Sequence, residues 1–460
     1  MSEPTFLTAA GQPWVTGRLM LQTEPFIILK LVIIGTGFSG SYLFHLMNVP
    51  VIALFCVFGA IAFRQVFRVR VQIWQIMLCG SSAALLTGSI SPTAALRAID
   101  LDIMVFLFWM FLAGRALESS GYLAQLAYSL FRRAKNADAL LFFIVFGCGL
   151  LSAFLMNDTV AIVGTPLMLM LARQHGMHTR PLLLSLAFAV TTGSVMSPIG
   201  NPQNLLIAIK GLPSDSFALF GRYLVLPTIA NLAATFFMLK FLFREHFGKG
   251  ELVHERDPLH DARMAAVSKF SLIAAILVTG LKIVLTAVPG GYAIPITWIA
   301  AAAGIPVLLF SPGKRELMRT MDWSTLVFFA AMFVLMKSVW ETGFFQGFFH
   351  SSGIGLTKIP SLMAVSILMS QLISNVPLVA LCLPSLTGGG ASPKLLMALA
   401  AGSTIAGNFL IFGAASNVII VQNAETRGDD GISFTDFARV GIPLTIVQAM
   451  IYGLAFALIP

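Results

Sequence analysis

Repeated apolar segments of about 20 residues constrain this chain more than any other feature of its sequence. An α-helix of that length crosses the hydrocarbon core of a bilayer, and such runs recur along the whole chain. We therefore expect an all-α polytopic membrane protein with about 11 transmembrane helices. The predicted spans are residues 26–47, 49–63, 71–90, 101–120, 181–209, 221–243, 267–288, 293–311, 322–341, 394–423 and 438–459.

The composition agrees with a chain that lies in lipid. Hydrophobic residues make up 57% of it and charged residues only 11%, whereas soluble proteins are about 25% charged, so a soluble enzyme is excluded. The sequence has no HExxH or GxSxG motif, and we predict no enzymatic activity. The net charge of +9 comes from short basic clusters between apolar runs, a pattern typical of membrane topology signals. Nucleic acid is not a predicted partner.

The distribution of basic residues predicts the topology. Lys and Arg concentrate on one set of loops when the N-terminus is placed in the cytoplasm. Residues 1–25 are then a cytoplasmic N-terminal segment, and the run from 26 is a retained span because no small-residue cleavage site follows it. We expect a multi-pass protein of a bacterial-type cytoplasmic (inner) membrane with its N-terminus inside.

Two further segments, residues 139–172 and 359–386, carry Asn and Pro near their middle and are long enough for two half-crossings each. We interpret both as re-entrant hairpins. Basic residues flank the first hairpin and nearly none flank the second, so the first is expected to enter from the cytoplasm and the second from outside. The two hairpins then approach each other through the bilayer.

The chain also divides into two similar halves. Residues 26–243 form the first transmembrane half, 244–266 a charged cytoplasmic linker, and 267–460 the second half. Asp102 precedes Asn157 by 55 residues and Asp322 precedes Asn375 by 53, and the sequences GNPQN and GAASN follow at similar spacings. With hairpins assigned to opposite sides, these halves are inverted repeats, each with a re-entrant hairpin and a broken helix. Secondary transporters place substrate and coupling ion at the interface of such repeats.

Asp158, at the tip of the first hairpin, is the carboxylate with the longest apolar sequence on both sides. A charge at that depth costs several kcal/mol unless a cation, a proton or a basic partner neutralises it. A coupling site is the favoured interpretation. A helix cap is the alternative, although Asn or Ser would cap at less cost.

Gly, Pro and amide residues also interrupt the spans 181–209 and 394–423. Such breaks free backbone carbonyls at mid-depth, where they can coordinate a cation. By contrast, Arg115, Lys282 and Lys337 also lie in apolar runs, and we expect their side chains to extend from helix ends toward the membrane surface.

Four segments carry a family resemblance that spans residues 30–455. NDTVAIVGTP, SPIGNPQNLLIA, SNVPLVALCLP and GAASNVIIVQNAE together resemble the ion transporter superfamily. That group includes divalent anion:sodium symporters, metal-citrate carriers, arsenite permeases and one class of sodium/proton antiporters. The Asn-Asp-Thr and Ser-Asn-Val-Pro tips look more like the arsenite permease and antiporter branches than the dicarboxylate symporters.

The resemblance implies a scaffold domain and a transport domain, elevator-type motion and a homodimer. It also implies which residues bind substrate and ions. These are Asn157, Asp158, Thr159, Gly200, Asn201 and Asn204 in the first half, and Ser374, Asn375, Gly413, Ser416 and Asn417 in the second. A Na+ site is expected near Asn157, Asp158 and Asn375, and no other cofactor.

The sequence therefore favours a secondary active transporter that moves a small inorganic or organic anion, coupled to Na+ or H+. The alternatives are a Na+/H+ (cation/proton) antiporter on the same fold, with Asp158 as the exchange carboxylate, the membrane subunit of an arsenite-type efflux pump, and a channel-like pore.

Overall fold

Every regular element in the described residues is a helix, as the apolar runs predict. The computed structural model describes residues 48–67, 71–122, 125–126, 129, 133–213, 215–244, 262–288, 292, 294–351, 356–429 and 431–459. All of these residues except Asn48 belong to one compact unit, Val49–Pro460. The first predicted span and the N-terminal segment lie outside the described residues.

The first half contains helices, two π-helical stretches and one helix break. Its elements are α3 (Val49–Phe67), α4 (Ile73–Leu86), α5 (Pro92–Ala98), α6 (Leu101–Ser119), α8 (Ala137–Phe142), η1 (Phe143–Cys148), α9 (Gly149–Leu155), α10 (Asn157–His175), α11 (Thr179–Ser194), α12 (Pro202–Lys210), α13 (Ser216–Phe220), η2 (Gly221–Val225) and α14 (Leu226–Leu242).

The second half repeats that order with small differences. Its elements are α15 (Ala262–Ala287), α16 (Thr297–Phe310), α17 (Lys314–Thr320), α18 (Trp323–Glu341), α19 (Phe344–Ser351), α20 (Ile359–Ile373), α21 (Asn375–Gly388), α22 (Pro393–Phe409), the short 3-10 turn η3 (Ile411–Gly413), α23 (Ala415–Thr426) and α24 (Phe434–Leu458).

Five helical segments of the described chain are long and apolar enough to cross a membrane: Ala137–Leu155, Ser216–Leu242, Ala262–Thr286, Trp323–Glu341 and Phe434–Leu458. The predicted span 101–120 is the continuous helix Leu101–Ser119, which carries the charged residues Asp102, Arg115 and Glu118, and the other predicted spans that the structure describes are shorter or broken helices. Helix α15 begins at Ala262, within the segment 244–266 that the sequence assigns to the linker. The segment Ala262–Ala266 is rich in Ala, Arg and Met, which favour helix, so the helix extends past the apolar run.

Both predicted hairpins are present, and each turns at one residue with a positive φ angle. Met156 joins α9 to α10 with φ of 64°, and Ser374 joins α20 to α21 with φ of 71°. They are the two non-glycine residues with positive φ in the described chain. The first hairpin extends from Ala137 to His175, a few residues beyond the predicted 139–172, because its capping residue Asn136 and the αL Gly176 set its ends.

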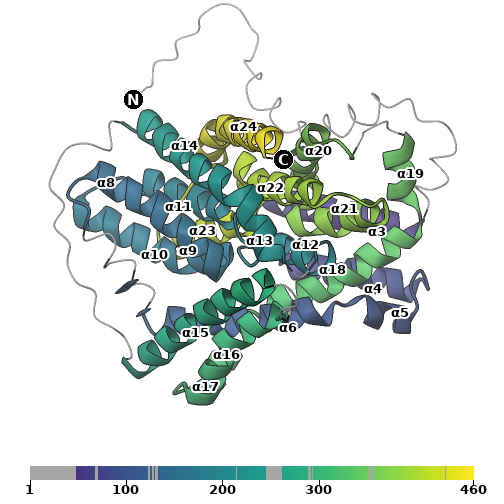
Figure 1. Cartoon of the computed structure of the whole chain (residues 1–460), viewed down its shortest axis with the longest axis horizontal. Helices are drawn as coiled ribbons and strands as arrows, with labels where there is room; N and C mark the ends of the chain where they lie inside the picture. Colours follow the sequence, from purple (N-terminus) through teal and green to yellow (C-terminus); the bar gives the residue numbers. More distant parts are fainter. Residues whose placement is uncertain are drawn as a thin grey trace, which may run out of the picture. The chain divides into compact units, whose positions relative to one another are not determined.

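Both predicted helix breaks are present as well. Residues 195–201 separate α11 from α12, and α22 ends at Phe409 before η3 and α23. The packing of these elements is reciprocal between the halves. The hairpin arm α10 contacts α23 of the other half, and the hairpin arm α21 contacts α12. Figure 1 shows α9, α10 and α11 together and α12, α21 and α22 together.

A second set of helices packs mainly within itself. Helix α6 contacts α15 and α16, and α18 contacts α3 and α4. This scaffold set (α3, α4, α6, α15, α16 and α18) meets the hairpins through the contacts of α6 with α10 and of α18 with α21. The fold thus separates the two hairpins and two broken helices from a scaffold of continuous helices.

One landmark of the sequence repeat needs correction. Asp102 lies in the first turn of α6, whereas Asp100 caps that helix by accepting from Ile103 N at 3.1 Å. Asp322 caps α18 in the same way, by accepting from Thr325 N at 3.0 Å. The repeat partner of Asp322 is therefore Asp100, because the capping position and not the sequence spacing defines the start of each 19-residue helix.

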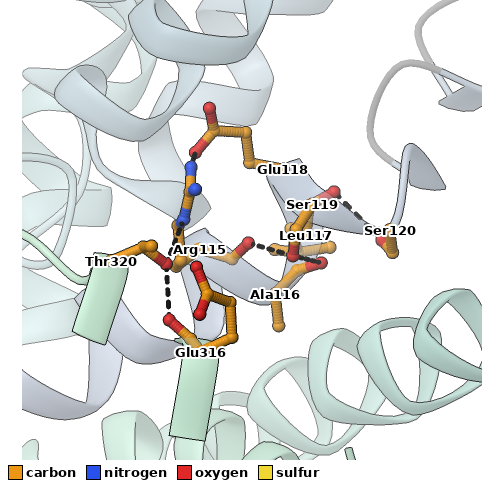
Figure 2. Close-up of polar contacts among 8 residues, drawn as sticks. All are labelled: Arg115, Ala116, Leu117, Glu118, Ser119, Ser120, Glu316 and Thr320. Carbon is orange, nitrogen blue, oxygen red and sulfur yellow. Dashed lines mark hydrogen bonds and ion pairs between the residues drawn. The ribbon is translucent and has the colours of Figure 1, made fainter. Parts of the chain in front are cut away.

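The basic residues inside apolar runs behave in two ways. Arg115 lies near the end of α6, where its guanidinium donates to Glu118 Oε2 at 2.7 Å and to Thr320 Oγ1 at 3.0 Å (Figure 2). Lys337 pairs with Glu341 in the last turns of α18. Lys282 contradicts the prediction, because its side chain is buried and its Nζ donates to Ile294 O at 2.6 Å. A backbone carbonyl left free before α16 satisfies Lys282 inside the protein.

Candidate functional site

The eleven predicted site residues lie at four places: the two hairpin tips and the two helix breaks. Asn157, Asp158 and Thr159 open α10, and Ser374 and Asn375 lie at the start of α21. The remaining predicted residues lie at the start of α12, before α23 or in its first turn: Gly200, Asn201, Asn204, Gly413, Ser416 and Asn417. Four helix N-termini, which carry partial positive charge, are thus part of the candidate site.

The first tip contacts the first break and, across the two halves, the second break. Asn157 N donates to Gly200 O at 2.9 Å, and Asn157 Nδ2 lies 3.5 Å from Ser416 Oγ. Thr159 packs against Gly114 of α6, where a Cβ atom would lie 3.0 Å from Thr159 Oγ1. A side chain at Gly114 would therefore push the tip away from the scaffold helix.

Asp158 is half-buried and forms no ion pair within the described part of the chain. Its Oδ1 atom is buried and has no hydrogen-bond partner. The charged side chain that acts on Asp158 electrostatically is another carboxylate, Asp322. Within the described residues, no basic side chain therefore pairs with Asp158.

The amides of the first break are fully engaged in holding the break itself. Asn201 Oδ1 caps α12 by accepting from Asn204 N at 2.9 Å, and Asn201 Nδ2 donates to Ser194 Oγ at 3.0 Å. Asn204 Nδ2 donates to three carbonyl oxygens at and just after the end of α11, those of Ser194, Val195 and Ser197, at 3.1–3.2 Å. These amides therefore hold the backbone of the break in place through its carbonyl groups.

Thr404 of α22 joins the first break to the second half. Its hydroxyl donates to Asn204 Oδ1 at 3.2 Å and accepts from Gln203 Nε2 and Asn201 Nδ2, each at 3.3 Å. Thr404, Asn201 and Asn204 are completely buried. The two halves are therefore connected by side-chain hydrogen bonds next to the hairpin tips.

The second tip and the second break have oxygen atoms without partners. Gln371 Nε2 donates to Ile367 O at 2.9 Å and to Ala406 O at 2.8 Å, and Asn417 Nδ2 donates to Gly407 O at 2.7 Å. Carbonyl oxygens only accept, so these bonds fix the orientation of both amides. Gln371 Oε1, Asn417 Oδ1 and Asn375 Oδ1 are buried without a hydrogen-bond partner.

The side chains of these three residues lie around one stretch of backbone, Gly407 and Gly413. A Cβ atom on Gly413 would lie 3.0 Å from Gln371 Oε1, and one on Gly407 would lie 3.7 Å from Asn375 Nδ2. Gly407 also accepts the hydrogen bond from Asn417. Neutral oxygens of this kind coordinate hard cations such as Na+, and they cannot bind an anion directly because they have no proton to donate.

Three polar residues in this region were not among the predicted site residues: Gln203, Gln371 and Thr404. Each is a polar side chain within an apolar run, which is the signal that could have identified it. Their contacts join elements far apart in the chain, and the pairing of those elements is not visible in a local pattern.

The family follows from a comparison with known protein families. Residues 58–392 of the chain match the family model described as "Citrate transporter". The chain belongs to the citrate transporter family. This assignment agrees with the superfamily resemblance of its hairpin and break motifs.

Proteins with similar sequences occur in bacteria, plants and animals. The chain is 26% identical to the 46 kDa membrane protein of Mycobacterium leprae (strain TN), with 77% of this chain and 86% of that protein covered. It is also 26% identical to the silicon efflux transporter LSI3 of Oryza sativa subsp. japonica (81% and 90% covered). It is 23% identical to the P protein of Homo sapiens, of which it spans only 58%.

A solved structure shares the fold of this citrate transporter family member. The YdaH transporter of Alcanivorax borkumensis superposes with a TM-score of 0.53 at 16% sequence identity, over 81% of this chain and 86% of that one. The family, the transporter relatives and this fold together establish the chain as a multi-pass membrane transporter.

Proposed function

We propose that this member of the citrate transporter family is a secondary active transporter that couples the movement of a small inorganic or organic anion to Na+ or H+. The supporting observation is the group of buried, partnerless oxygens at the second tip, together with the unpaired carboxylate of Asp158 at the first. Bound cations would coordinate the partnerless oxygens and neutralise the Asp158 carboxylate. They would also supply positively charged groups, which the side chains of these tips and breaks do not.

The helix ends around the site favour this pairing of cation and anion. Four N-termini, those of α10, α12, α21 and α23, carry partial positive charge that stabilises an anion. The C-terminal carbonyls of α9, α11, α20 and α22 can coordinate cations. An anion bound between the two tips would then contact N–H groups and the bound cations together.

A second candidate is a cation/proton antiporter on the same fold. Asp158 at the first tip favours the antiporter, because a lone carboxylate that binds a proton and a cation in turn is sufficient for exchange. In that case Asp158 carries both ions in turn, and the second tip has no anion to bind.

A third candidate is an efflux role, as the membrane subunit of an arsenite-type pump. One relative is named as a silicon efflux transporter.

Alternating access would arise from movement of the hairpins and broken helices against the scaffold set of helices. The contact between Thr159 and Gly114 lies on that boundary and has little side-chain bulk to oppose sliding. We propose an elevator-type movement of this kind in a homodimer in the cytoplasmic membrane, with the N-terminus inside.

The test is transport by purified protein in proteoliposomes, with a panel of oxyanions and carboxylates under imposed Na+ and H+ gradients. The proposal predicts uptake of at least one anion that depends on one of the two gradients. If the protein exchanges cations for protons in the absence of any anion, it is the antiporter and not an anion transporter. If the anion flux follows only the anion's own gradient, transport is not coupled to either ion.

A further inference from the structure

We propose that Gln448 of α24 is a positioning residue, which holds together the ends of the two broken helices without touching substrate or ion. The inference rests on the proposed function, because the broken helices are the elements that would form the ion and substrate sites. It identifies a functional residue on a helix that contributes none of the site residues described above.

Gln448 is the centre of a hydrogen-bond network that joins four helices. Its Nε2 donates to Thr192 Oγ1 of α11 at 2.8 Å and to Thr235 Oγ1 of α14 at 3.3 Å. Its Oε1 accepts from Asn408 Nδ2 of α22 at 2.9 Å, and the same Nδ2 donates to Thr192 at 3.0 Å. One amide therefore ties α11 of the first half to α22 of the second.

The network is fully enclosed. Thr192, Thr235, Asn408 and Gln448 each have 0% of their surface exposed. A buried polar group in a membrane protein is costly unless it is hydrogen-bonded, and apolar side chains of similar size would fill the same space without that cost. Four such residues in mutual contact are therefore better explained by a positional requirement than by packing.

Each end of the network leads directly to a helix break. Thr192 lies two residues before Ser194, whose hydroxyl and carbonyl accept from Asn201 and Asn204. Asn408 directly follows Gly407, whose carbonyl accepts from Asn417. Gln448 thus determines where the last turns of α11 and α22 lie, and with them the freed carbonyls of both breaks.

Helix α24 also packs closely against the end of α22. A Cβ atom at Gly441 would lie 2.2 Å from Asn408 O, so this position allows the two backbones to approach. Contact at Gly441 and the hydrogen bond at Gln448 hold Asn408 of α22 against α24 at two positions along α24. The second break is therefore supported from outside the hairpins.

The chemistry requires a side chain that both donates and accepts at this position. An amide does both at any pH. A protonated carboxyl group also does both, but a carboxylate only accepts, so it would leave Thr235 without its donor and Thr192 with the hydrogen bond from Asn408 alone. Gln448→Glu is therefore a conservative variant that should work only in its protonated form.

The experiment compares three variants in proteoliposomes: Gln448→Leu, Gln448→Glu and the control Thr445→Val. Thr445 lies one turn earlier on α24, is equally buried, and donates only to Gly441 O of its own helix, so removing its hydroxyl should leave transport unchanged. We expect Gln448→Leu to raise the ion concentration for half-maximal transport by roughly tenfold or more, because several buried partners lose a bond. Gln448→Glu should approach wild-type transport at low pH and fall relative to wild type as the pH rises.

A second measurement separates positioning from transport. Hydrogen exchange of the amides in 193–197 and 409–414 should be at least about tenfold faster in Gln448→Leu and unchanged in Thr445→Val. Unchanged exchange at both breaks, or a Gln448→Glu variant with the pH profile of the wild type, would overturn the positioning role. If the wild type transports without any ion dependence, the proposed coupling fails, while the exchange measurement still decides the role of Gln448.

Discussion

The two hairpin tips have the same backbone and different chemistry. Met156 and Ser374 turn the chain with φ of 64° and 71°, and an Asn follows each of them. The next residue is Asp158 in the first tip and Val376 in the second. At the first tip and break the amides are engaged, and the carboxylate is unpaired; at the second, neutral amide oxygens are unpaired.

This difference indicates a division of roles between the repeats. A carboxylate can exchange a proton or a cation, so the first tip is suited to sense a gradient of either. Neutral oxygens bind a cation but are indifferent to pH, so the second tip is suited to hold an ion without titrating. The common fold fixes where the ions would lie, and side-chain identity decides what each site responds to.

The largest expected effect is that of Asp158→Asn. The amide is nearly isosteric and still suits the first turn of α10, so the protein should fold, but the group that a proton or cation neutralises is gone. We expect the dependence of transport on the ion gradient or on pH to be abolished, and substrate binding to weaken by the coupling free energy between the sites. The measurement is proteoliposome transport with and without each gradient.

Val376→Asp is the matched test at the second tip. It places a carboxyl group at the position equivalent to Asp158, and should add a pH dependence that the wild-type second tip lacks. If transport by Asp158→Asn depended on ions and on pH as the wild type does, Asp158 would be only a helix cap, and the two tips would not have different roles.

The second expected effect is a difference in labelling between the two hairpins. Thr387 and Gly388 at the end of the second hairpin, and Arg173 and Gln174 at the end of the first, are all exposed. With the hairpins opening to opposite sides of the membrane, an impermeant reagent outside should label cysteine at 387 or 388 but not at 173 or 174. The background must lack the exposed Cys56 and Cys79. Equal labelling from one face would contradict the inverted arrangement.

The third effect is smaller and concerns the neutral tip alone. Gln371→Met removes one unpaired oxygen and leaves Ala406 O without its donor. We expect the cation concentration for half-maximal transport to rise about tenfold, as for loss of one or two buried hydrogen bonds. Thr387→Val on the same hairpin is the control, because its hydroxyl donates only within α21. An unchanged cation affinity in Gln371→Met would place the cation elsewhere.

The smallest effect concerns the helix caps that begin α6 and α18. Asp100 is nearly buried and pairs with Lys210 of α12, whereas Asp322 accepts hydroxyl hydrogen bonds from Ser324 and Thr325. Lys210→Met should lower stability by about 1 kcal/mol, and salt should reduce that difference. Thermal unfolding in detergent at low and high salt measures both. Thr325→Val should lower the free energy of unfolding by a similar amount, and salt should not change this loss.

Most of the architecture was predictable from local sequence. Apolar runs of membrane-crossing length predict the helices, and Asn, Gly and Pro within such runs predict both hairpins and both breaks, because an interrupted helix in lipid needs polar or glycine residues where its backbone is free. Repetition of those interruptions predicts two related halves. The eleven predicted site residues accordingly lie at the tips and breaks.

The sequence alone did not determine how the polar groups pair. It suggested Asp102 as a repeat landmark where the cap is Asp100, and it predicted that the Lys282 side chain extends toward the membrane surface, whereas this side chain is buried and donates to Ile294 O. It also gave the amides of both breaks the same role. Asn204 proved to be fully bonded and Asn417 half-bonded, because their partners come from helices as far apart in the chain as α11 and α22. Composition and periodicity act locally and select the elements, whereas hydrogen-bond pairing in a buried site depends on which elements meet, and only the tertiary structure decides that.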